Sequence, residues 1–89
     1  MVAINRALAV AELHGASAGL EALEQVASDA RLAEYQPYWA ARAELLAKAG
    51  ASGEARQAYD IAIGLERDHA VRRFLQKRQS AVGSAVEGE

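Results

Sequence analysis

The chain has 89 residues, a length that corresponds to one small domain and leaves no room for a two-domain enzyme. It contains no cysteine, which excludes disulfides, thiolate zinc sites and cysteine nucleophiles, and which agrees with a reducing, cytoplasmic environment. Ten Lys and Arg residues oppose twelve Asp and Glu residues, for a net charge of −2. This balance argues against a stand-alone nucleic-acid binder that depends on neutralising phosphates, so a protein partner is expected.

Alanine dominates the composition, with 22 of the 89 residues, and only five residues are aromatic. Alanine is the best helix former and lets helices approach closely, and no segment alternates apolar and polar residues with period two. No segment approaches the roughly 18 consecutive apolar residues of a membrane span, and the N-terminal residues lack the features of a targeting signal. We therefore expect an all-α domain with no membrane association.

The pattern predicts two helices before the first long connector. Apolar residues recur at three- and four-residue spacing over residues 2–13 and again over residues 18–29. Gly15 is expected to end the first helix, and Ser17 to cap the second. Residues 31–36 are less regular and are expected to form a connector.

Three more helices are predicted after that connector. Pro37 favours a helix start, so the third helix is expected over residues 37–49, ending at Gly50, with an ion pair between Glu44 and Lys48. The fourth is expected over residues 53–65 with Ser52 as its cap, and the fifth over residues 69–79 with Asp68 as its cap. The predicted domain covers residues 1–79. Residues 80–89 are small and polar and are expected to be a flexible tail.

Spacing also predicts which side chains are buried. Trp39 and Tyr59 are expected in the core, whereas Tyr35 and Tyr38, beside Pro37, are expected to be partly exposed. Other expected core positions are Ile4, Leu8, Ala11, Leu20, Leu23, Val26, Ala27, Ala30, Ala43, Leu46, Ala49, Ala55, Ala58, Ala62, Leu65, Val71, Phe74 and Leu75.

An internal repeat with an offset of 36 residues relates the two predicted helix pairs. The offset superposes Ala7 on Ala43, Gly19 on Ala55, and Leu23 on Tyr59. The second copy resembles the tetratricopeptide signature at Trp39, Ala43, Leu46, Gly50, Ala55, Tyr59 and Ala62. It departs from that signature at Arg42, where the signature usually has Leu, and in having no proline after the second helix. The resemblance implies a tetratricopeptide-like right-handed helical repeat of two helix pairs plus a C-terminal capping helix.

Longer strings are similar to the C-terminal extension of one group of bacterial RNA polymerase sigma factors, the extracytoplasmic-function sigma factors that carry a tetratricopeptide-like domain. These strings are Val2–Glu12, Tyr35–Leu46, Glu54–Tyr59 and Arg72–Leu75. The promoter-reading and polymerase-binding regions of that family are absent from these 89 residues. The resemblance implies a regulatory protein-interaction domain that contacts the sigma regions of its parent chain or RNA polymerase, and that meets DNA only indirectly.

The resemblance also implies a binding face, because tetratricopeptide arrays bind partners on the inner surface formed by the first helix of each pair. The corresponding positions are Asn5, Leu8 and Glu12 in the first copy and Ala41, Glu44 and Lys48 in the second, with Arg6 and Arg42 nearby. The alternative is that Leu8 and Ala41 belong to the core and that the others form a solvated face.

A basic cluster on the last predicted helix has two interpretations. Arg72, Arg73, Lys77 and Arg78 follow Asp68 with no acidic residue among them. Cations are favourable near a helix C-terminus and on the exposed face of a capping helix. The other interpretation is contact with an acidic protein, or with DNA that the parent protein holds nearby. Arg72 and Arg73 are counted among the candidate partner-binding residues.

No enzymatic site is expected. His14 and His69 lie at helix ends with no metal-binding, paired-carboxylate or phosphate-binding motif around them, and no cofactor is implied. Two alternatives to the sigma-factor interpretation stay open: a generic tetratricopeptide adaptor, and a helical domain that self-associates as a homodimer.

Overall fold

The structure is a computed structural model that describes residues 2–26 and 29–82. Every regular element in these ranges is helical, which confirms the all-α prediction. The elements are α1 (Val2–His14), α2 (Ala16–Glu24), the short 3₁₀ helix η1 (Ala30–Glu34), α3 (Gln36–Lys48), α4 (Ser52–Leu65) and α5 (His69–Ala81).

Two glycines mark helix breaks as predicted. Gly15 has a φ of +98° and Gly50 a φ of +86°, a region that side-chain-bearing residues rarely adopt. The predicted cap of α5 is also confirmed, because the Asp68 carboxylate accepts hydrogen bonds from the backbone N–H groups of Ala70 and Val71. These residues separate α1 from α2, α3 from α4 and α4 from α5.

The two predicted serine caps are wrong. Helix α2 begins at Ala16, so Ser17 lies inside it, and α4 begins at Ser52 with Ala51 in the capping position. Neither helix has a side-chain cap. Helix α2 also ends at Glu24, five residues before the predicted end at Asp29.

The predicted connector is partly helical. Asp29 accepts a hydrogen bond from the backbone N–H of Arg31 and so starts η1. The chain then passes through Tyr35 into α3, which has Pro37 in its first turn as predicted.

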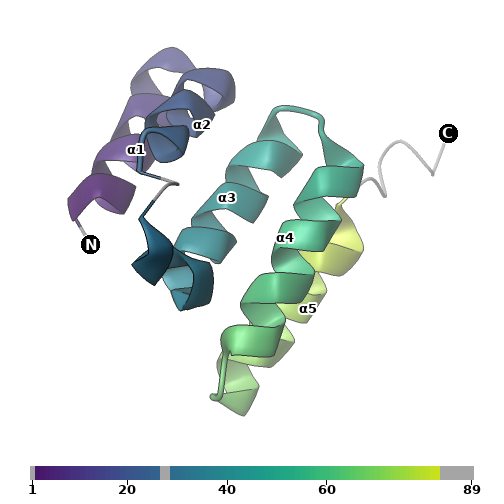
Figure 1. Cartoon of the computed structure of the whole chain (residues 1–89). Helices are drawn as coiled ribbons and strands as arrows, with labels where there is room; N and C mark the ends of the chain where they lie inside the picture. The colour runs from purple at the N-terminus through teal and green to yellow at the C-terminus, as the bar shows by residue number, and fades with distance from the viewer. Residues whose placement is uncertain (1, 27–28, 83–89) are drawn as a thin grey trace, which may run out of the picture.

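Neighbouring helices in the chain pack against one another. The contacts are most extensive between α3 and α4, and next between α1 and α2, while α2 with α3 and α4 with α5 join these pairs. Helix α1 also touches α3. Figure 1 shows the α1–α2 pair beside α3, with α4 next and α5 behind it.

The core consists of two clusters with small side chains at many positions. One cluster lies between α3, α4 and α5 and includes Ala43, Ala55, Tyr59 and Leu75. The other lies between α1, α2, η1 and α3 and is built from Ile4, Ala7, Leu23, Leu32, Tyr38, Ala41 and Leu45. Leu20 and Trp39 pack against both clusters.

The prediction that Tyr38 is partly exposed is wrong. Tyr38 is buried, at 5% exposure, and its ring packs edge-on against Trp39 with the ring centroids 5.2 Å apart. The reason is that α3 lies between α2 and α4 and so has two buried sides. Tyr35 is 36% exposed, as expected.

Four residues that were expected in the core are exposed. Phe74 is 60% exposed and Val71 37% exposed, and Ala49 and Ala30 are exposed as well. Ala30 begins η1 and is not part of α2, and Ala27 lies outside the described residues. Helix α5 contacts α4 through the side that holds Leu75, and consecutive helical residues point about 100° apart. Phe74 therefore points away from the core.

The end of α5 extends beyond the predicted domain boundary. Ser80 and Ala81 are helical, and Val82 is buried with its carbonyl accepting a hydrogen bond from the Arg56 guanidinium at 2.7 Å. Residues 83–89, the rest of the predicted tail, lie outside the described residues.

Candidate interaction groove

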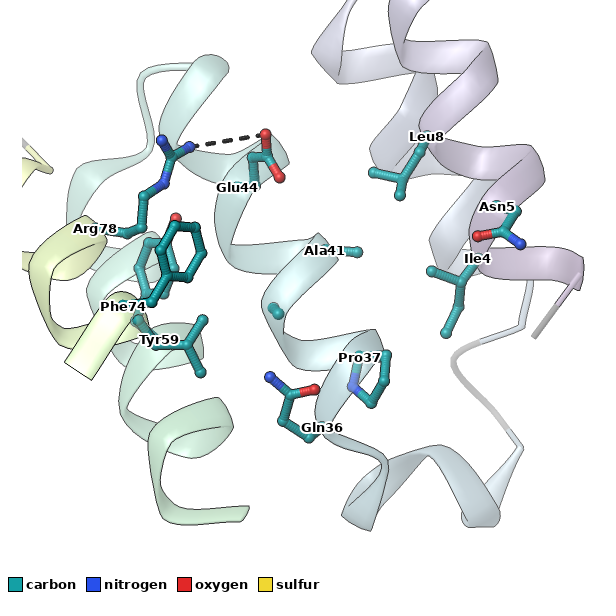
Figure 2. A pocket seen from close by; sticks show the side chains of 12 residues that line it. Ile4, Asn5, Leu8, Gln36, Pro37, Ala41, Glu44, Tyr59, Phe74 and Arg78 are labelled. Atoms are coloured by element: carbon teal, nitrogen blue, oxygen red, sulfur yellow. Dashed lines mark ion pairs between the residues drawn. The ribbon is translucent and has the colours of Figure 1, made fainter. Parts of the chain in front are cut away.

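A groove of about 460 Å³ lies over α3, with α1 on one side and α5 on the other. Figure 2 shows side chains of α1 and α5 facing this space across α3. We call it the α1–α3–α5 groove. It is lined by Ile4, Asn5 and Leu8 of α1, Gln36, Pro37, Ala40, Ala41 and Glu44 of α3, Tyr59 of α4, and Phe74, Leu75 and Arg78 of α5.

Side-chain size explains the shape of the groove. Its floor on α3 includes Ala40 and Ala41, whereas its walls carry the larger side chains of Leu8 on α1 and Phe74 on α5. Small residues on the central helix therefore leave a depression that larger residues on the two flanking helices border. The alanine-rich composition leads directly to this surface.

Glu44 of α3 makes two ion pairs, one within its own helix and one with α5. Its Oε1 atom lies 3.4 Å from Lys48 Nζ, which confirms the predicted pair, and 3.7 Å from Arg78 Nη2. The second contact is drawn in Figure 2 and links α3 to α5. All three side chains are 40% exposed or more, so these contacts add little to stability.

Several residues of the predicted binding face lie together in the groove. Asn5, Leu8, Ala41 and Glu44 all line it. Ala41 is 5% exposed, so it belongs to the core and to the floor of the groove at once.

Glu12 and Lys48 lie beside the groove. They line a smaller hollow of about 180 Å³ that also includes Leu8 and Glu44. These two predicted residues therefore border the same surface, on the side where α1 and α3 end.

The two predicted arginines lie elsewhere. Arg42 lines a separate hollow of about 370 Å³, together with Tyr38, Trp39 and residues of η1. Arg6 is exposed and is not among the residues that line the groove. Four positions that the 36-residue offset relates line the groove, whereas these two neighbours along the chain do not.

The basic helix contributes one cation to the groove. Arg78 lines it, whereas Arg72 is half-buried and Arg73 and Lys77 are exposed outside its lining. Sequence reasoning missed Phe74 as a surface residue. Its spacing four residues before Arg78 was the available signal, because such residues share one side of a helix.

A second charged pair lies away from the groove at the start of η1. The Arg31 guanidinium donates to both carboxylate oxygens of Asp29, at 3.0 and 2.7 Å. The side-chain hydrogen bond from Arg31, followed by its backbone N–H, lowers the pKa of Asp29 from 3.8 to about 2. The same carboxylate raises the pKa of Arg31. This pair closes a local turn and faces none of the groove residues.

The two histidines lie at helix ends and are exposed, His14 on α1 and His69 on α5. Within residues 2–26 and 29–82, no three His, Cys, Asp or Glu side chains gather as metal ligands would. In the same ranges, no helix has both the length and the apolar character needed to cross a bilayer.

Comparisons of the chain with protein-family models, with curated proteins and with solved structures found no match.

Proposed function

We propose that this chain is a tetratricopeptide-like interaction domain that regulates a bacterial RNA polymerase sigma factor of the extracytoplasmic-function group and acts in the cytoplasm. Its partners are the sigma regions of the parent chain or the polymerase, and DNA is reached only through the parent protein.

The observation that carries the proposal is the similar burial of three pairs of positions that lie 36 residues apart. Ala7 and Ala43 are both fully buried, and Leu23 is fully buried while Tyr59 is 3% exposed. Gly19 and Ala55 are buried too. Gly19 lies in close contact with Ala7 and Ala11 of α1, and its repeat-related counterpart Ala55 lies in the same core cluster as Ala43. This supports a helical repeat of two pairs, with α5 as the capping helix.

The location of the groove agrees with this interpretation. Helices α1 and α3 are the first helices of their pairs, and both line it. In a tetratricopeptide-like array, the first helices form the inner surface that binds partners. The α1–α3–α5 groove is therefore the proposed binding surface.

The sigma-factor assignment rests on the four sequence strings described above. Every residue that lines the groove except Arg78 falls within one of them. The part of the chain that resembles the sigma-factor extension is thus also the part that forms the groove. This coincidence supports a shared binding role.

Transcription by the full-length parent sigma factor with RNA polymerase, with and without residues 1–89, tests this function. We expect deletion to change transcript yield several-fold at the promoters of that sigma factor. The truncated protein must still bind core polymerase, which controls for misfolding of the remaining regions. Unchanged transcription under that control would refute the proposal.

The exposed Phe74 supports a second candidate, a generic adaptor or self-associating domain, because a 60% exposed aromatic residue favours contact with some partner. Sedimentation of the 89-residue chain distinguishes these cases. A dimer would support self-association, whereas a monomer at high concentration would exclude it. The gene region encoding residues upstream of Met1 would separate a sigma factor from an unrelated adaptor.

A further inference from the structure

The α1–α3–α5 groove has apolar side chains on both walls. Phe74 on α5 is 60% exposed, although burial of a phenylalanine side chain is favourable. Ile4 and Leu8 stand on the opposite wall, on α1. Figure 2 shows these walls apart, with Ala41 between them. A partner that inserts apolar side chains here would cover Phe74.

The α5 edge of the groove carries excess positive charge. Between His69 and Ala81 the helix has four Arg or Lys residues and no Asp or Glu. Lys77 and Arg78 follow Phe74 by three and four residues, so both lie on its side of the helix, Arg78 in the groove lining and Lys77 just outside it. An apolar partner that reaches Phe74 therefore meets cations next to it.

Glu44 does not neutralise this edge. A single carboxylate oxygen of Glu44 faces both Lys48 and Arg78, so one negative charge meets two positive charges. The Arg78 contact, at 3.7 Å, is longer than a charge-assisted hydrogen bond. Arg78 can therefore turn toward a carboxylate of a partner at little cost.

The walls also decide the conformation of the partner. They are helices whose backbone N–H and C=O groups bond within each helix, so they give an extended peptide no edge to pair with. An extended segment would bring unpaired backbone groups into an apolar groove, which is unfavourable. A helical segment satisfies its own backbone and can present an apolar side.

We infer that the α1–α3–α5 groove binds an acidic amphipathic helix, whose apolar side contacts Phe74 and Leu8 and whose carboxylates contact Arg78 and Lys77. This inference rests on the proposed function as an interaction domain and specifies the chemistry of its partner.

A pair of synthetic peptides tests the inference. The acidic peptide is a helix of about 18 residues with Leu at positions i, i+3, i+4 and i+7 and Glu beside this stripe, and the basic peptide has Lys in place of each Glu. Each is titrated into the ¹⁵N-labelled 89-residue chain. We expect the acidic peptide to shift the backbone amide signals of residues 4–8 and 74–78, and to bind at least about tenfold more tightly than the basic peptide.

Matched variants locate the contact. Phe74→Ala is expected to weaken binding of the acidic peptide by at least about fivefold, as removal of an aromatic anchor does, and Lys77→Glu is expected to weaken it as well. The controls are Ile61→Ala, which removes a side chain that is 39% exposed on α4, and Arg67→Glu, which reverses an exposed charge before α5. Both controls should leave the affinity unchanged. Circular dichroism verifies that each variant is folded.

Three outcomes would overturn the inference. The first is equal affinity for the two peptides, or no binding of either up to about 1 mM, where even the weakest specific contacts are detected. The second is a set of amide shifts outside the groove. The third is concentration-dependent shifts at Phe74 without peptide, which would identify a second copy of the chain as the occupant.

The two proposals fail separately. If the acidic peptide binds as expected but deletion of residues 1–89 leaves transcription unchanged, the sigma-factor function is refuted and the groove chemistry stands. If deletion changes transcription but neither peptide binds, the acidic helix is refuted and the regulatory function stands.

Discussion

Gly19 of α2 lies in close contact with α1. A Cβ atom at this position would lie 2.6 Å from the Cβ of Ala11, 3.0 Å from the carbonyl oxygen of Ala7 and 3.1 Å from Cδ1 of Leu45. We expect Gly19→Ala to lower the free energy of unfolding by about 1–2 kcal/mol, because overpacking outweighs the gain in helix propensity. Urea denaturation followed by circular dichroism measures this.

Gly64 provides the matched control. It lies in α4, and a Cβ atom there would meet no atom within 4 Å. Gly64→Ala should therefore raise the free energy of unfolding by about 0.4–1 kcal/mol. If Gly19→Ala stabilised the protein as Gly64→Ala does, the close packing of α1 on α2 would be wrong.

Asp29 makes one contribution to stability depend on pH. Its pKa is lowered to about 2 in the folded protein, from 3.8, chiefly by the hydrogen bond from the Arg31 side chain. Its stabilising contribution is therefore complete above the unfolded value and disappears as the pH falls through about 2. Asp29→Asn should lower the urea midpoint at about pH 6 and have little effect below about pH 2.

The titration of Asp29 can also be observed directly. NMR of its carboxyl group should give a pKa of about 2, and Arg31→Ala should raise it toward 3.8. An Asp29 pKa unaffected by Arg31→Ala would contradict the assigned cause.

For single residues, the sequence predicted chemical roles such as helix capping better than it predicted burial. Asp68 caps α5 as its residue type and position predicted, but Ser17 and Ser52 do not act as caps. Serine is a favourable cap residue wherever it follows a break, but α2 starts two residues earlier than predicted, with Gly15 in the capping position. Tyr38 is buried although partial exposure was expected, and Phe74 is exposed although burial was expected. Both differences arise because tertiary packing selects which side of a helix is buried.

Helix α5 forms one wall of the groove, and its Asp68 cap contributes to its stability. The carboxylate accepts the N–H groups of Ala70 and Val71 at 2.8 and 3.2 Å. We expect Asp68→Ala to lower the free energy of unfolding by about 1 kcal/mol, the ordinary cost of losing such a cap. Ser52→Ala, which removes no side-chain cap, should cost less than about 0.5 kcal/mol. Equal effects in urea denaturation would contradict the assigned caps.

The positions of four helices could be predicted because glycine and proline mark where helices begin or end, and apolar spacing marks the residues between. Helices α1, α3, α4 and α5 lie within a few residues of the predicted ranges. The end of α2 could not be predicted, because its apolar spacing continues through Val26 although the helix stops at Glu24. The 3₁₀ helix η1 depends on the local Asp29–Arg31 turn, which apolar periodicity does not encode.

Packing between neighbouring helices predicts how stability is distributed over the whole molecule. The contacts of α3 and α4 with each other are the most extensive, and both helices lie between other helices. Native-state hydrogen exchange should therefore be slowest at amides of α3 and α4, such as those of Leu45 and Ala58. Amides of α5 around Phe74 should exchange at least about tenfold faster. Uniform protection across all helices would contradict this gradient.

The α1–α3–α5 groove shows which part of a surface a sequence repeat can predict. The 36-residue offset identified positions on α1 and α3, and the groove joins four of them. The contribution of α5 could not be found in this way, because that helix has no counterpart in the first copy. Its Phe74 wall depends on how the last helix docks on α4, which is a tertiary property.

Trp39 has a consequence for experiments on this protein. It is the sole tryptophan of the chain, it packs against both core clusters, and its indole N–H donates to the Ala33 carbonyl at 3.1 Å. Its fluorescence therefore reports on the junction between the two helix pairs. A red-shifted emission with unchanged far-ultraviolet circular dichroism would mean that the pairs had separated while each remained helical, so an intrinsic optical signal distinguishes opening of the molecule from its unfolding.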